Sequence, residues 1–162
     1  MFKSAFVSTV REQEGNLHGN NDFMSDILED RLAKIPIFKT LRLRLVVVGE
    51  GTATLIAPYE SAYDGVFKSF HGGLLMTLAD TAACVAVLSL AGADAEITTT
   101  DMNIRFLAAC RSDCTAEAAL IKFGKTLCPV SVELRDTQGV RVAVAQVTYM
   151  RLQKALLETL KR

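Results

Sequence analysis

The chain has 162 residues, of which 50% are hydrophobic and 22% are charged, so it is long enough for one globular domain and too apolar for an intrinsically disordered protein. Basic and acidic residues number 18 each, so the net charge is zero and nothing indicates a nucleic-acid or anionic-membrane partner. Four cysteines at irregular spacing are typical of free thiols in the reducing cytoplasm, where we expect the protein to be, and they predict no metal site.

The first third of the chain predicts a tail, a short helix and two strands. Residues 1–20 are expected to form a flexible tail whose apolar run is too short for a secretory signal. An amphipathic pattern predicts a helix over 24–36, with Pro36 marking its end. Leucine alternates with arginine at the start of a predicted strand over 41–48, and a Gly-Glu-Gly turn leads into a returning strand over 52–59.

The central segment, residues 70–92, has the sequence FHGGLLMTLADTAACVAVLSLAG and carries one charge, Asp80. Its length would also suit a membrane-spanning helix. Strands are predicted on both sides and no basic cluster flanks it, so we favour a helix in the core of the fold. Because it is apolar nearly all round, we expect it to be covered on most sides.

Four strands are expected after the central segment. Their patterns cover residues 98–106, 114–123, 127–136 and 140–152, and a short helix over 153–162 would end the chain.

These elements predict an α+β fold with one domain over residues 21–162. The strands are joined mostly by short turns, so the sheet should be antiparallel. A strongly twisted sheet of this size can wrap around one long central helix, with short helices near both ends of the chain.

The start of the central helix and its single carboxylate could both carry chemistry. Gly72 and Gly73 would lie in the first turn, where N–H groups lack helical partners and can bind a carbonyl oxygen that gains negative charge. The glycines could equally allow close packing against a strand. Asp80 would be either fully hydrogen-bonded or kept for reaction, as a general base or a nucleophile.

The spacing of these groups predicts a dimer. Gly72 and Asp80 are eight residues apart, or roughly 12 Å along a helix axis, so one carbonyl cannot contact both. If both serve one reaction, they must come from different subunits. A two-fold homodimer would bring them together twice.

The sequence FHGGLLMTLADTAACV, followed by TTTDMNIRFL, KFGKTL and VELRDTQGVRVAVAQVTY, resembles the hotdog-fold acyl-CoA thioesterases of the PaaI type. The resemblance covers roughly residues 40–152. It implies the hotdog fold and the hydrolysis of an acyl-CoA thioester to a free acid and CoA, without a metal or other cofactor. It also implies a homodimer, often paired into a dimer of dimers.

The resemblance implies a role for each residue of the motif. Asp80 would be the general base or nucleophile, and the amide of Gly72 from the partner subunit would polarise the thioester carbonyl. His71 would support the loop, and Thr99 would hold the attacking water. Strict strand alternation instead favours one of the neighbouring threonines at 98 and 100, unless a bulge or an interface position intervenes.

Three further residues are candidate substrate contacts. Gly73 shares the first helical turn, Phe70 could line the acyl pocket or belong to the core, and Lys125 could meet a CoA phosphate or be an ordinary exposed lysine.

The sequence departs from the family at two positions. Gly65 stands where many relatives have an asparagine, and the neighbouring Asp64 cannot donate a hydrogen bond when ionised. Lys68 stands where a glycine is common. The first departure also favours an alternative, a non-catalytic acyl-CoA-binding protein. A hydratase or dehydratase is less favoured, because His71 and Asp80 are nine residues apart.

Overall fold

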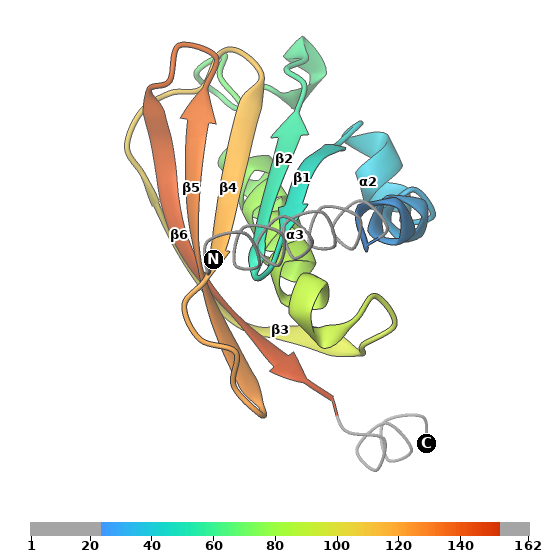
Figure 1. Cartoon of the computed structure of the whole chain (residues 1–162). Helices are drawn as coiled ribbons and strands as arrows, with labels where there is room; N and C mark the ends of the chain where they lie inside the picture. The colour runs from blue at the N-terminus through green and yellow to red at the C-terminus, as the bar shows by residue number, and fades with distance from the viewer. Residues whose placement is uncertain (1–23, 153–162) are drawn as a thin grey trace, which may run out of the picture.

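Six antiparallel strands form one curved sheet around a long helix, as Figure 1 shows. The computed structural model describes residues 24–152, so the predicted tail over 1–20 and the predicted helix over 153–162 lie outside the described residues. The strand order is β1-β2-β4-β5-β6-β3. This arrangement confirms the predicted α+β fold with an antiparallel sheet and one central helix.

The order of elements along the chain also agrees with the prediction: two strands, the long helix, then four strands. The central helix is α3, Gly72–Ala91. The strands are β1 Arg44–Gly49, β2 Thr52–Ala57, β3 Ile97–Phe106, β4 Cys114–Leu120, β5 Leu127–Asp136 and β6 Arg141–Arg151.

The structure corrects the prediction for the region around Pro36. Residues 24–32 are helical, but Pro36 begins a second short helix, α2 (Pro36–Thr40), instead of ending the first. Proline suits this first position because the N–H that it lacks would have no helical partner there. The following strand begins at Arg44, later than expected, because Arg42 has a φ of 50° and turns the chain.

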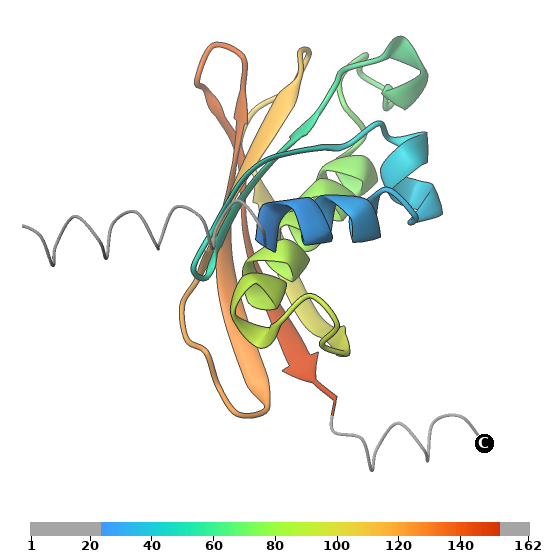
Figure 2. The same ribbon diagram turned by 45° about the vertical axis from the view of Figure 1, so that its right-hand side comes forward.

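The core of the protein surrounds α3. This helix contacts all six strands, and residues 24–32 lie beside it and outside the sheet, as Figure 2 shows. Leu28 and Leu32 from that short helix belong to the same hydrophobic cluster as the buried residues of α3. By length and composition α3 could cross a membrane, but half of its apolar window is buried within this fold. These contacts fit the interpretation of a core helix.

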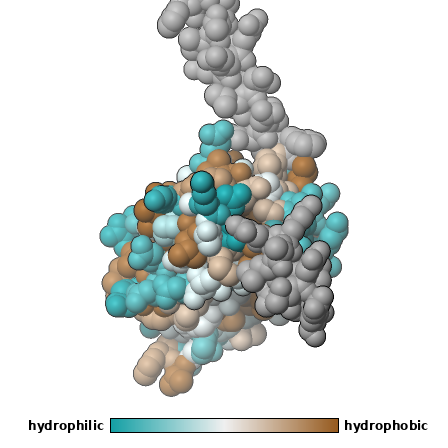
Figure 3. Space-filling view, turned by 90° about the horizontal axis from the view of Figure 1, so that it is seen from below, coloured by the Kyte–Doolittle hydropathy of each residue, from teal (hydrophilic) through white to brown (hydrophobic). Residues whose placement is uncertain are grey.

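Strand β3 has an open edge within the described part of the chain. It pairs with β6 on one side and lies at the end of the sheet order. Only Ile97, Met102 and Ile104 of its ten residues are half-buried, and the others are exposed. An edge of this length presents unpaired backbone groups that can pair with another strand. On the face of the molecule seen from below in Figure 3, hydrophilic and hydrophobic residues are mixed.

Two leucines of α3 test how much the covered face of the helix stabilises the fold. Leu78 is 0% exposed and Leu90 is 40% exposed. We expect Leu78→Ala to lower the free energy of unfolding by roughly 2–5 kcal/mol, because it removes buried apolar contacts and leaves a cavity. Leu90→Ala should cost less than half as much. Urea unfolding at one fixed protein concentration measures both, and equal losses would contradict this account of the core.

Candidate active site

The start of α3 leaves one backbone donor available. His71 is the N-cap residue, and its Nδ1 accepts a hydrogen bond from the N–H of Gly73 at 3.0 Å. The N–H of His71 itself donates to the carbonyl of Tyr63 at 2.8 Å. The N–H of Gly72 has no acceptor among residues 24–152. Of the two predicted glycine amides, that of Gly72 is therefore free to bind an incoming oxygen, whereas that of Gly73 is occupied by the cap.

Gly72 also lies against the end of β3. A Cβ atom at this position would be 3.0 Å from Cζ of Phe106, a contact closer than ordinary packing. Both reasons for a glycine at position 72 therefore apply: it allows close approach to β3, and its amide is free.

The carboxylate of Asp80 is held by two hydroxyl groups from two different strands. Thr99 Oγ1 on β3 donates to Asp80 Oδ1 at 2.9 Å, and the hydroxyl of Tyr149 on β6 donates to the same oxygen at 2.8 Å. The side chain is half-buried. The second oxygen, Oδ2, has no partner among the described residues, so Asp80 is anchored without being saturated.

A bulge in β3 selects Thr99 among the three neighbouring threonines. The pairing with β6 shifts register between Thr99 and Asp101, which turns the Thr99 side chain toward Asp80. The hydroxyl of Thr100 instead donates to a backbone carbonyl of β6 at 3.1 Å, and Thr98 is exposed. Strict alternation does not hold here because a bulge adds one residue to one strand of the pair.

Tyr149 is the site residue that the sequence analysis missed. It is 4% exposed, on the same inward face of β6 as Val147 and Ala145. A buried tyrosine hydroxyl usually has a hydrogen-bond partner. A tyrosine on the inward face of a predicted strand could therefore have been recognised as a candidate partner for Asp80. Burial, followed by the nearby Cys84 and Asp80, raises the pKa of Tyr149, so the phenol stays protonated and acts as a donor. Burial and then Asp80 likewise raise the pKa of the Cys84 thiol to about 11.

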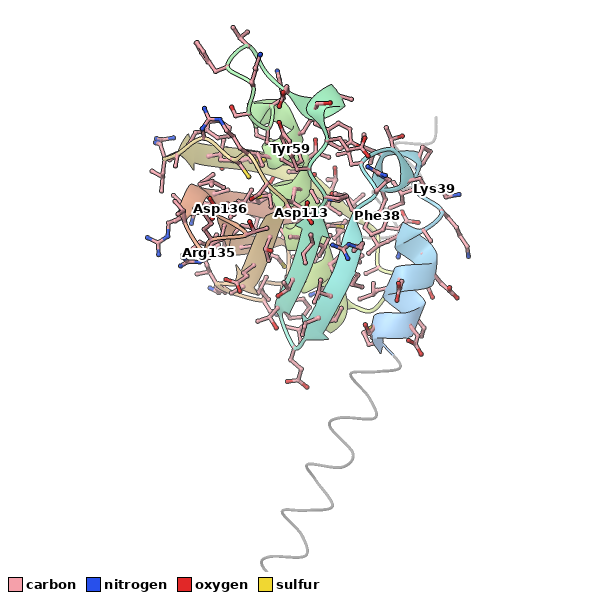
Figure 4. All side chains as sticks on the ribbon, turned by 90° about the horizontal axis from the view of Figure 1, so that it is seen from above. Phe38, Lys39, Tyr59, Asp113, Arg135 and Asp136 are labelled. Carbon is pink, nitrogen blue, oxygen red and sulfur yellow. The ribbon has the colours of Figure 1, made fainter. Side chains whose placement is uncertain are left out.

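Phe70, a candidate for the acyl pocket, belongs to the core of this subunit. It is 5% exposed, its ring stacks on Tyr63 at a centroid distance of 5.8 Å, and Tyr59 meets it edge-on at 6.0 Å. The backbone N–H of Tyr59 donates to Asp113 Oδ1 at 2.9 Å, and Figure 4 shows these two residues side by side from above. The three rings anchor the loop that leads into α3.

Lys125 is exposed, in the 121–126 loop that joins β4 to β5. Met150 pairs both with the first residue of β5 and with Thr98 of β3. The loop therefore lies at the end of the sheet where Thr99 of β3 contacts Asp80. Lys125 is at that end and not at the end where α3 begins with Gly72.

The loop before α3 contains both positions at which the sequence departs from the pattern of the family that it resembles. A Cβ at Gly65 would be 3.6 Å from Cδ2 of His71, so an asparagine there would lie against the histidine. Asp64 does not replace it, because its Oδ1 accepts the hydroxyl of Tyr59 at 2.6 Å. Lys68 has a φ of 49°, in the left-handed region that glycine adopts most readily.

The cysteines of the protein are free thiols. Cys84 is half-buried, and Cys110, Cys114 and Cys128 are buried. Within residues 24–152, no group of three or more histidine, cysteine, aspartate or glutamate side chains is arranged to hold a metal ion.

The sequence model of the thioesterase superfamily matches residues 67–143, which include the start of α3, Asp80 and Thr99. The chain has the hotdog fold of the thioesterase superfamily. A solved structure of a thioesterase family protein from Silicibacter pomeroyi is 25% identical, covers 80% of this chain and 98% of its own, and has a TM-score of 0.74. The PaaI protein of the phenylacetic acid degradation operon of E. coli is 23% identical, with 80% and 96% covered and a TM-score of 0.73.

A protein of Saccharolobus solfataricus, named as a candidate esterase, is 27% identical over 104 residues, which are 64% of this chain and 74% of that protein. The predicted resemblance to the hotdog thioesterases is therefore confirmed. Together the matches support thioester hydrolysis as the general activity.

The cap at the start of α3 can be tested with two substitutions of one residue. We expect His71→Ala to lower the free energy of unfolding by about 1 kcal/mol, because it removes the side chain that accepts the Gly73 N–H. His71→Asn should retain most of the stability, since asparagine is a good N-cap residue. Thermal unfolding measures both variants. Equal destabilisation by alanine and asparagine would show that the cap contributes little.

Proposed function

We propose that this protein is an acyl-CoA thioesterase that hydrolyses a CoA thioester to a free acid and CoA. The observation that carries the proposal is Asp80, a half-buried carboxylate with one oxygen anchored by Thr99 and Tyr149 and the other without a partner among the described residues. The free amide of Gly72 adds a donor suited to a developing oxyanion.

The exposed stripe of α3 supports a site between two subunits. Gly73, Met76 and Asp80 follow at helical spacing, and each is exposed or half-buried although the opposite face of the helix is buried. This stripe leaves Asp80 accessible from outside the subunit. In the proposal, a partner subunit covers it.

Strand β3 supplies the geometry for that partner. One end carries Thr99, which contacts Asp80, and the other end carries Phe106, which lies against Gly72. If two copies pair through this open edge, antiparallel and about a two-fold axis near Met102, the Thr99 end of each subunit meets the Phe106 end of the other. Asp80 of one subunit then approaches Gly72 of its partner, twice per dimer.

The proposed reaction adds water across the thioester carbonyl. The carboxylate of Asp80 removes a proton from water as it attacks, or attacks the carbonyl carbon directly to form an anhydride that water then opens. The partner subunit's Gly72 N–H stabilises the negative oxygen of the tetrahedral intermediate. Collapse of that intermediate breaks the carbon–sulfur bond and gives the free acid in the first route or the anhydride in the second, and the CoA thiolate leaves and takes up a proton.

The remaining parts of the proposal concern the substrate and the assembly. Lys125 would contact a phosphate of CoA as a point charge, and CoA itself is part of the substrate, so the proposed reaction needs no metal or organic cofactor. Two dimers would pair into a tetramer. The free thiols fit a protein that works in the cytoplasm.

A non-catalytic acyl-CoA-binding protein is the second candidate function. The observation in its favour is Gly65, which leaves no side-chain donor beside His71. Binding of acyl-CoA with no release of CoA would favour this candidate over the thioesterase.

Asp80→Asn tests the role of the carboxylate. The amide keeps the shape but cannot accept a proton from water, so we expect hydrolysis of a panel of acyl-CoAs to fall by at least about a hundredfold. Free CoA released is the measurement. Asp94→Asn is the matched control, because Asp94 is an exposed aspartate just beyond the end of α3. Undiminished activity in the Asp80→Asn variant would reject the proposed mechanism.

Gly72→Pro and Gly72→Ala together test the amide. Both add a Cβ against Phe106, but only proline removes the N–H, and it suits the first position of a helix. We expect a much larger loss of kcat for proline than for alanine.

Mixing subunits tests whether the site is shared. A dimer with one Asp80→Asn subunit and one Gly72→Pro subunit would contain one intact site if the two groups act across the interface. After random reassociation, we expect roughly a quarter of wild-type activity from two nearly inactive proteins. No recovery of activity in the mixed sample would place both groups of one site in the same subunit.

A further inference from the structure

Two hydroxyl groups are directed at the same carboxylate oxygen of Asp80. Thr99 Oγ1 and the Tyr149 hydroxyl are 2.9 Å and 2.8 Å from Oδ1, and within residues 24–152 no group is within hydrogen-bond distance of Oδ2. A carboxylate oxygen has two lone-pair sites. Both sites of Oδ1 are therefore used inside the subunit.

We propose that Tyr149 is a positioning residue that, together with Thr99, holds Oδ1 of Asp80 so that Oδ2 is the reacting oxygen. This inference rests on the proposed thioesterase function and adds to it the choice of oxygen and the residue that makes the choice. Tyr149 itself does not touch the substrate. It acts through the carboxylate.

The hydroxyl of Tyr149 has one proton, and both the side chain and the main chain of Asp80 lie within hydrogen-bond distance of it. The hydroxyl oxygen is 2.8 Å from the carboxylate oxygen and also 3.0 Å from the backbone carbonyl oxygen of the same residue. A single rigid phenol thus lies between the side chain and the main chain of Asp80. Thr99 approaches from the other strand, so rotation of the carboxylate breaks contacts with two elements of the sheet.

The direction of these hydrogen bonds follows from protonation. Burial raises the pKa of Tyr149, with further contributions from Cys84 and Asp80, so the phenol keeps its proton and donates it. An ionised carboxylate can only accept. The phenol is therefore the donor and Asp80 Oδ1 the acceptor.

Cys84 on α3 is a further titratable group beside this pair. Burial, followed by Asp80, raises the pKa of its thiol to about 11, so the thiol is neutral at pH 7. It therefore places no second negative charge beside Asp80.

Tyr149→Phe tests the proposal, because it removes the hydroxyl and keeps the ring. We expect kcat for acyl-CoA hydrolysis to fall about ten- to a hundredfold with KM little changed, since the carboxylate loses its fixed orientation. A merely structural role would instead reduce the fraction of folded protein or raise KM, and would not lower kcat alone.

Tyr63→Phe is the matched control. It also removes a phenol hydroxyl, one that donates to the backbone carbonyl of Thr40 at 2.7 Å, away from Asp80. We expect its kcat and KM to match those of the wild type. If Tyr149→Phe does not fold, Thr99→Val replaces it as the test and should lower kcat with KM little changed, whereas Thr99→Ser, which keeps the hydroxyl, should not.

The outcomes separate this inference from the function on which it rests. Full activity in Asp80→Asn would overturn the proposed mechanism whatever the tyrosine does. An inactive Asp80→Asn combined with a wild-type kcat in Tyr149→Phe would leave the mechanism in place and overturn the positioning role. A raised KM with an unchanged kcat in Tyr149→Phe would also overturn it.

Discussion

The structure depends on how the carboxylate of Asp80 is hydrogen-bonded on an otherwise uncharged, apolar helix. Asp80 is the one charged residue of a helix that contacts all six strands, and an unbonded carboxylate in this half-buried position would be costly. Thr99 and Tyr149 lower that cost from two strands that are neighbours in the sheet. The same three residues join helix and sheet at this point, so the site is built on the rigid part of the fold.

The position of that contact explains why only half of the carboxylate is satisfied. Strands β6 and β3 are the last two of the sheet, and beyond β3 the described chain offers no further strand. Asp80 therefore lies where the sheet ends, with one oxygen bonded to the two strands and the other without a partner among residues 24–152. A core position further into the sheet would have enclosed both oxygens and left no room for a substrate.

Sequence patterns found the elements but not the contacts between them. The period of two along β3 and β6 and the apolar run of α3 depend on local chemistry, so they could be recognised directly. Pro36 could not be assigned in the same way, because proline both ends helices and begins them. The contact of Thr99 with Asp80 depends on a bulge that strand alternation does not encode. Tyr149 lies 69 residues from Asp80 in the sequence, and the pairing of β3 with β6 places it beside Thr99.

Gly72 shows how one small residue can meet two demands at once. Its missing side chain makes room for the ring of Phe106, and its amide is the first-turn donor left free when His71 caps the next residue. Phe106 is also the last residue of the open edge strand. A larger residue at position 72 would therefore displace the ring at the edge that we propose for dimerisation, besides crowding the amide. In the proposed dimer, binding of the carbonyl oxygen and closure of the interface would both depend on the absence of a side chain at this position.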